Sequence, residues 1–223
     1  MKNLKPVNVM FETGVSDLLQ EAVFEGIDEI LVLAGVDKFI TVNNHGNWRK
    51  SPYKKGEELI PYQSMDWYLV CGQYCSDRSN QLNAEAIMYA IWQEPWQQVE
   101  PHYDVVVLCS DIYADKSTNY AAGLAQPGLA TIISVNRYLG LAGKLQFECI
   151  KTEIMHEVGH IFGLVPRDRE RDIEENFGPH CTNVCVMRQG LRVPNDWILI
   201  TRDRLGFGPF CASCRDNLRE YFS

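Results

Sequence analysis

Histidine, basic residues and long apolar runs are all scarce in this sequence. It has five histidines among 223 residues, and its 29 Asp and Glu outnumber its 21 Lys and Arg, which gives a formal net charge of −8. A negative balance argues against nucleic acids and anionic membranes as partners, because their phosphates select for Lys and Arg. No apolar run approaches the ~20 residues that a membrane span needs. We therefore expect no nucleic-acid or membrane partner.

The sequence also lacks the apolar stretch of a secretory signal after its basic start at Lys2 and Lys5. This predicts a cytoplasmic protein, in which thiols stay reduced, so the eight cysteines need an explanation other than disulfides. Four of them lie in mostly apolar surroundings and are expected to be buried free thiols: Cys71, Cys75, Cys109 and Cys149.

Helical and extended patterns alternate through the first 163 residues. Periodicity and helix-end signals predict helices over 16–24, 83–93, 147–163 and 213–221. Short apolar runs predict strands at 30–33, 39–42, 67–70, 104–109, 128–135 and 197–201, and the polar stretch 43–64 predicts a surface loop. We expect an α/β fold with a helix-covered sheet. Residues 1–163 would form its α/β part, and residues 164–223 a small cysteine-rich part of the same catalytic unit.

The clearest chemical signal is the run His156–His160, which reads HEVGH. Histidines four residues apart lie one above the other on a helix, so both can bind one metal ion. Glu157 can reach a metal-bound water and take its proton, as in zinc hydrolases. Gly159 weakens a helix, and a structure tolerates this where something approaches the backbone closely. The run therefore predicts a catalytic zinc with Glu157 as general base.

The third zinc ligand is absent from its usual position. After the glycine that follows such a motif, here Gly163, a ligand is expected three residues on, and this chain has Pro166 there. His45 lies in an Asn/Gly turn and His102 follows a proline, so both are expected at the surface. The candidates that remain are His180 and two aspartates in the charged segment 166–179, Asp168 and Asp172.

Four late cysteines form two close pairs with C-x3-C and C-x2-C spacing: Cys181 with Cys185, and Cys211 with Cys214. Four thiolates in two such pairs make a good tetrahedral zinc site. Thiolates bind zinc tightly enough to order a loop-rich segment.

These motifs together resemble the archaemetzincins. The resemblance rests on HExxHxxG at His156, the His180-Cys181 pair, Cys185-Val186-Met187 and the last Cys pair. It extends with less force to three upstream segments, 78–84, 120–125 and 133–137, and so covers roughly residues 78–222. It implies a metzincin-like α/β domain with a small zinc-bound subdomain.

The resemblance also implies a set of roles for the site residues. The catalytic zinc would lie on His156, His160 and His180, the structural zinc on the four late cysteines, and Met187 would form the Met-turn beneath the histidines. Two features depart from the family pattern: His180 comes fourteen positions after Pro166, and the cysteine spacings differ.

The function expected from this sequence is a zinc metallopeptidase that acts on a peptide or protein. The edge strand around 123–129 would pair with the substrate backbone. Two alternatives remain open: a zinc-stabilised interaction protein with a vestigial HExxH site, and a metal-dependent amidohydrolase acting on other amides. The substrate, the oligomeric state and the role of segment 166–179 (a lid, a flap or an inert loop) do not follow from the residues.

Overall fold

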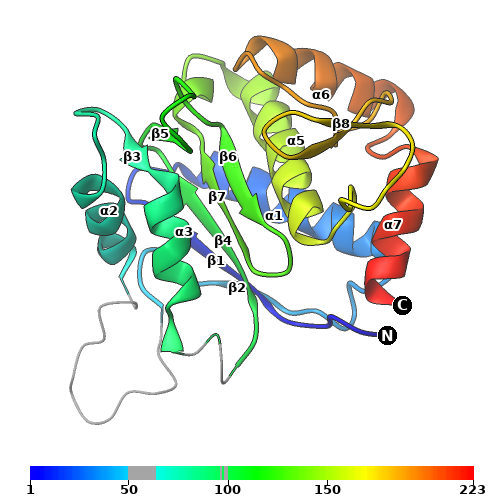
Figure 1. The fold of residues 1–223 in the computed structure, drawn as a ribbon, viewed down its shortest axis with the longest axis horizontal. Helices are drawn as coiled ribbons and strands as arrows, with labels where there is room; N and C mark the ends of the chain where they lie inside the picture. Colours follow the sequence, from blue (N-terminus) through cyan, green and yellow to red (C-terminus); the bar gives the residue numbers. More distant parts are fainter. Residues whose placement is uncertain (50–63, 96, 98–99) are drawn as a thin grey trace. The chain divides into compact units, whose positions relative to one another are not determined.

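The computed structural model covers residues 1–223 and describes all of them except 50–63, 96 and 98–99. The fold is mixed α/β, as the sequence predicts (Figure 1). Its strands are β1 (Val7–Phe11), β2 (Val42–Asn44), β3 (Leu82–Asn83), β4 (Tyr103–Leu108), β5 (Ile112–Tyr113), β6 (Gly123–Gln126), β7 (Ala130–Ser134), β8 (Ile173–Glu175) and β9 (Pro179–Cys181). Its helices are α1 (Asp17–Ala34), α2 (Met65–Tyr74), α3 (Ala84–Trp92), the 3-10 helix η2 (Asn136–Tyr138), α5 (Gly143–Ile161), α6 (Asn195–Phe207) and α7 (Ala212–Phe222). Among the described helices, none is long and apolar enough to cross a bilayer.

The chain groups into two compact units. One comprises Lys5–Val15 and Thr41–Asn136, and the other comprises Met1–Leu4, Ser16–Ile40 and Arg137–Ser223. Helix α5 therefore groups with the cysteine-rich segment that follows it. The boundary expected at residue 163 marks a change in composition and stays a prediction.

The first unit is built on a five-stranded sheet with the order β2-β1-β4-β7-β6. Strands β1, β2, β4 and β7 are parallel, and β6 runs antiparallel to β7 at one edge. All of β4 is buried, in agreement with its continuous apolar run. Helices α2 and α3 supply Tyr68, Ile87 and Ile91 to the core that they share with Val106 and Ile132 of the sheet.

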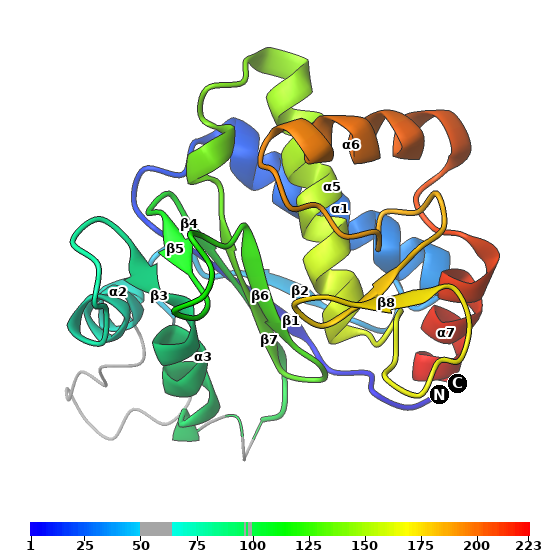
Figure 2. The same cartoon turned by 45° about the horizontal axis from the view of Figure 1, so that its top comes forward.

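Helices α1 and α5 of the second unit pack side by side (Figures 1 and 2). The contact is close because α1 has Gly26 where they meet. A Cβ there would lie 3.0 Å from Cγ2 of Ile154 and 3.1 Å from the carbonyl oxygen of Lys151. On another side of α5, Thr201 and Arg204 of α6 both hydrogen-bond Thr152, at 2.9 and 3.0 Å. These contacts hold the helix that carries the HEVGH run.

Three predicted strands are wrong, because the segments are helical. Residues 30–33 lie in α1, residues 67–70 in α2 and residues 197–201 in α6. A short apolar run fits a buried helix as well as a strand, so periodicity alone does not separate them. The strand predicted at 39–42 is represented only by Val42, the first residue of β2. Of the loop predicted at 43–64, residues 50–63 lie outside the described residues.

Candidate active site and cysteine cluster

His156 and His160 project from the C-terminal half of α5, one helical turn apart. His156 is 3% exposed, and its Nε2 lies 3.1 Å from Nε2 of His160. Two nitrogens bound to one zinc at 2.0–2.1 Å in a tetrahedron would lie about 3.4 Å apart. The separation in this structure therefore already suits a shared metal ion.

His180 comes to the same place from β9. Its ring centroid lies 5.2 Å from that of His156 and 4.9 Å from that of His160. One ring nitrogen from each of the three histidines lies within 4.8 Å of the other two. The structure thus brings together the three histidines that the resemblance implies.

Asp168 and Asp172 do not belong to this group. Both are exposed, and the carboxylate of Asp172 lies 3.9 Å from Nη2 of Arg169. Among the described residues, the metal-ligating group at this place contains His180 and neither aspartate.

Backbone carbonyls orient two of the three rings. Nδ1 of His156 lies 2.8 Å from the carbonyl oxygen of Val186, and Nδ1 of His180 lies 2.9 Å from that of Gly178. If each Nδ1 donates, each Nε2 presents a lone pair to the centre, as metal-binding histidines do. Burial, with repulsion from His180, lowers the pKa of His156 to about 3, and burial lowers the pKa of His160 and His180 as well. All three imidazoles are therefore neutral near pH 7, the form that binds metal.

Glu157 follows the first histidine and is 7% exposed. One turn before it on α5, Glu153 is fully buried, and its Oε2 accepts a hydrogen bond of 2.8 Å from the hydroxyl of Tyr138. Burial, together with the nearby Glu157 charge, raises the pKa of Glu153 well above its usual range. Sequence reasoning missed this pair, although an acidic residue among apolar neighbours four positions before Glu157 was its signal.

Met187 packs against α5 between Glu157 and His160, at Gly159, and Trp197 contacts His156. Met187 is fully buried, and a Cβ at Gly159 would lie only 2.4 Å from its Sδ. Gly159 therefore leaves room for the close approach that the sequence predicts. The Trp197 ring stands edge-on to His156 at 5.0 Å. Sequence reasoning missed Trp197, because the apolar run that contains it predicts a strand.

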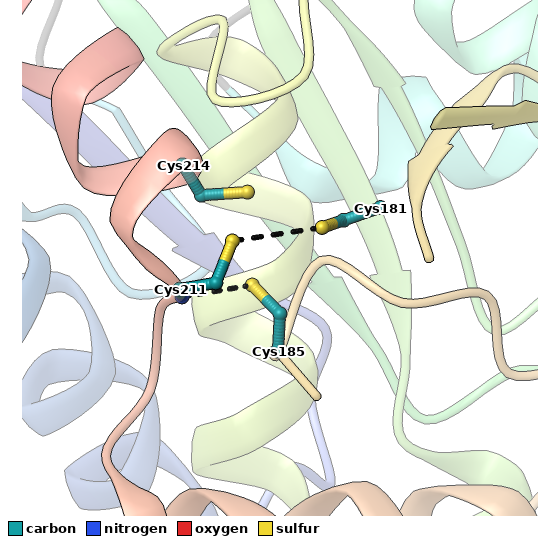
Figure 3. Close-up of side chains that lie close together, drawn as sticks. All are labelled: Cys181, Cys185, Cys211 and Cys214. Carbon is teal, nitrogen blue, oxygen red and sulfur yellow. Dashed lines mark hydrogen bonds between the residues drawn. The ribbon is translucent and has the colours of Figure 1, made fainter. Parts of the chain in front are cut away.

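The four late cysteines converge at a second place, which adjoins the histidines along the chain because Cys181 directly follows His180 in β9. Their sulfur atoms all lie within 4.8 Å of one another, and Sγ of Cys181 lies 3.7 Å from Sγ of Cys211 (Figure 3). Tetrahedral zinc with bonds of 2.3 Å would set sulfurs about 3.8 Å apart. The donor set and its spacing both fit a zinc ion.

Each of these sulfur atoms also lies near an N–H donor. Arg169 donates to Cys214 at 3.3 Å and to Cys181 at 3.5 Å. The side chain of Asn183 donates to Cys211 at 3.6 Å, and the backbone N–H of Cys211 donates to Cys185 at 3.4 Å. Hydrogen bonds from Cys185 and Cys214, and a smaller one from Arg169, lower the pKa of Cys181, whereas hydrogen bonding within the same group raises the pKa of Cys185 to about 12 and also raises the pKa of Cys214. The N–H donors around the sulfur atoms suit thiolates, the form in which cysteine binds metal.

Three other expectations need correction. Of the four earlier cysteines, only Cys149 is buried; Cys71 and Cys109 are half-buried and Cys75 is exposed. His102 is not at the surface, since it is 3% exposed and its Nε2 lies 3.1 Å from the Asp104 carboxylate. His45 is half-buried. These expectations rest on local composition, which does not show how a segment packs.

Similar proteins support the resemblance. An archaemetzincin from Nanoarchaeum equitans is 38% identical over 82 residues, 37% of this chain and 36% of that protein. One from Archaeoglobus fulgidus is 34% identical over 104 residues, 46% of this chain and 53% of that protein. The chain thus matches about a third to a half of the length of these curated relatives. No protein-family model matches the chain.

Solved structures extend the likeness in fold to nearly the whole chain. The archaemetzincin of Methanopyrus kandleri matches with a TM-score of 0.65 and 19% identity, over 99% of this chain and 97% of that one. The Archaeoglobus fulgidus archaemetzincin, solved with malonate, matches with a TM-score of 0.58 and 20% identity, over 95% and 99%. By sequence over the matched part and by fold over nearly its whole length, the chain is similar to archaemetzincins.

Proposed function

We propose that this chain is a zinc-dependent peptidase that hydrolyses peptide bonds with Glu157 as general base. One observation carries the proposal: three imidazoles converge beside a glutamate on a buried helix. A structural metal site has no need of the glutamate at that position. The names of the relatives, archaemetzincins, support the same class of reaction.

Two sets of residues would hold zinc. His156, His160 and His180 would hold the catalytic ion, and the four late cysteines the structural one. At the histidine site, a bound zinc supplies a lowered pKa for its water and polarisation of the substrate carbonyl. The fourth coordination position would stay open, as in other catalytic zinc sites.

The residues of the chain would handle the substrate and the proton. The Glu157 carboxylate would accept the proton of the attacking water and then deliver it to the leaving amine. Met187 would form the apolar floor below the histidines, as the Met-turn does in metzincins. Strand β6 lies at the edge of its sheet, so its backbone can pair with an extended peptide.

Replacing Glu157 by Ala tests this function. We expect turnover of a peptide library to fall by about 10²–10⁴-fold, because general base catalysis contributes that much. Zinc content should stay unchanged, since the ligands remain. Cleavage at the parental rate by the variant would contradict the role of Glu157. Two bound zinc ions in a parent protein that cleaves no peptide would favour the interaction protein or the hydrolase of other amides.

Replacing His180 by Ala tests the third ligand. We expect the zinc content to fall from about two ions to about one per chain, because two histidines alone hold zinc weakly. Asp168→Asn and Asp172→Asn are the matched controls and should keep both ions. If His180→Ala retains two ions and activity while an aspartate variant loses them, the third ligand is that aspartate.

A further inference from the structure

The charged segment 166–179 is part of a small hairpin that carries ligands of both candidate metal sites. Strand β8 in this segment pairs antiparallel with β9, with Glu174 opposite His180 and Ile173 opposite Cys181. Just before β8, the carbonyl oxygen of Asp172 accepts a hydrogen bond of 3.1 Å from the N–H of Thr182. The end of the segment is therefore fixed to the strand that bears the ligands.

Neighbouring residues on a strand point to opposite faces. His180 and Cys181 are neighbours on β9, and both are buried. His180 joins the histidine group and Cys181 joins the cysteine group. A shift of β9 would therefore displace one ligand of each site together.

Arg169, which precedes β8 in the same segment, also reaches the cysteine group. Its Nη1 lies 3.3 Å from Sγ of Cys214, and its Nη2 lies 3.5 Å from Sγ of Cys181. Its Nε donates to the carbonyl oxygen of Arg171 at 2.7 Å. The guanidinium thus contacts two of the four sulfur atoms through Nη1 and Nη2, and the backbone of its own segment through Nε.

The positive charge of Arg169 indicates whether its contacts favour the metal-bound or the metal-free cysteine group. Its side chain is only 7% exposed, and the Asp172 carboxylate, 3.9 Å away, is 45% exposed. A cation that has lost its water needs a nearby anion. Zinc on four thiolates carries a net charge of about −2 and supplies that anion, whereas four neutral thiols do not.

We propose that Arg169 is a positioning residue that clamps the hairpin 166–181 to the occupied cysteine site and thereby couples that site to the His180 ligand of the catalytic site. The inference rests on the proposed pair of zinc sites and goes beyond the proposed peptidase activity. It gives the inserted segment a role as a ligand-carrying clamp rather than a lid, a flap or an inert loop.

Metal exchange in Arg169→Met and Arg169→Lys tests the clamp. Met removes the charge and the hydrogen-bond donors, whereas Lys keeps the charge but lacks the planar guanidinium with its several N–H groups. Arg171→Met is the matched control, because Arg171 lies two residues away and is exposed. Each full-length variant would be loaded with Co²⁺ to follow the thiolate-to-metal absorption, and with Zn²⁺ to follow release of each ion to a chelator.

We expect Arg169→Met to weaken metal binding at the cysteine site by about 10–100-fold, the usual cost of losing a residue that supports ligands. Zinc at the histidine site should also leave faster, although no histidine is changed. Arg169→Lys should restore part of the loss, and Arg171→Met should behave as the parent. Unchanged cobalt spectra and release rates in Arg169→Met would overturn the clamp, as would an equal loss in Arg171→Met.

A faster loss at the cysteine site alone, with parental release from the histidine site, would overturn the coupling. These readouts do not depend on peptide cleavage. A parent chain that binds both ions but cleaves no peptide would defeat the proposed peptidase and leave the clamp standing.

Discussion

At the scale of single residues, Gly159 is the position at which the HEVGH run packs directly against Met187. It lies within α5, where Ala in place of Gly would normally stabilise a helix by about 1 kcal/mol. Here a Cβ would lie 2.4 Å from Sδ of the fully buried Met187 and 3.4 Å from Leu164. Overpacking of a filled core costs about 1–3 kcal/mol, so the clash should outweigh the gain in helix propensity.

We therefore expect Gly159→Ala to lower the free energy of unfolding by roughly 1 kcal/mol and to weaken zinc binding at the histidines about tenfold. Calorimetry and competition with a zinc chelator measure the two effects. Gly206→Ala is the control, because Gly206 is an exposed residue of α6 and an added Cβ there would meet no other part of the chain within 4 Å. A Gly159→Ala variant that gains stability as the control does would contradict this account of Met187.

A second residue-scale prediction concerns Asp104, which is fully buried beside Arg49 and His102. Burial alone would raise the pKa of Asp104, but the Arg49 guanidinium and His102 lower it to about 2. A pKa below the unfolded value of ~3.9 stabilises the fold above that pH, by on the order of 2 kcal/mol, and this contribution is lost as the pH falls toward 2.

Asp104→Asn should therefore cost about 3 kcal/mol near pH 7, because Arg49 loses one of its two buried anionic partners among the described residues and keeps only Glu94. The difference from the parent should shrink as the pH falls from 5 toward 2, which urea unfolding at several pH values measures. The control Asp216→Asn removes an exposed carboxylate and should show little effect at any pH. An Asp104→Asn difference that stays constant with pH would contradict the lowered pKa.

At the scale of secondary structure, local sequence predicts a helix correctly where the periodic pattern is long or where residues that cap the helix mark its ends. The periodicity of 83–93 predicts α3, whose Asn83 side chain caps it by accepting the N–H of Ala86 at 3.0 Å. The helix predicted at 147–163 is α5, and it ends before Gly163, which has φ +64°. Residues 67–70 and 197–201 show only a few apolar positions each, and for such short runs packing decides between helix and strand.

Some residues of the site can likewise be predicted from local sequence, whereas others depend on contacts between distant parts of the chain. Two histidines and a glutamate on one helical face follow from spacing alone. The pairing of β8 with β9 does not, because it depends on how an irregular segment folds back on itself. Arg169, Trp197 and the Glu153–Tyr138 pair escape sequence reasoning for a related reason: each acts through contacts with residues far away in the sequence.

At the scale of the whole molecule, the two units differ in what should hold each of them together. The unit that contains the five-stranded sheet has its own apolar core, with Tyr68, Ile87 and Val106 fully buried.

We expect removal of zinc by a chelator to expose the amides around Cys181 and Cys214 to hydrogen exchange, because thiolate–zinc bonds order loop-rich segments. The amides of β4 and β7 should keep their protection. Mass spectrometry of exchanged peptides measures both, and zinc added back should restore the parental pattern. Loss of protection in β4 to the same extent as around Cys181 would show that the metal supports the whole fold rather than the cysteine-rich segment.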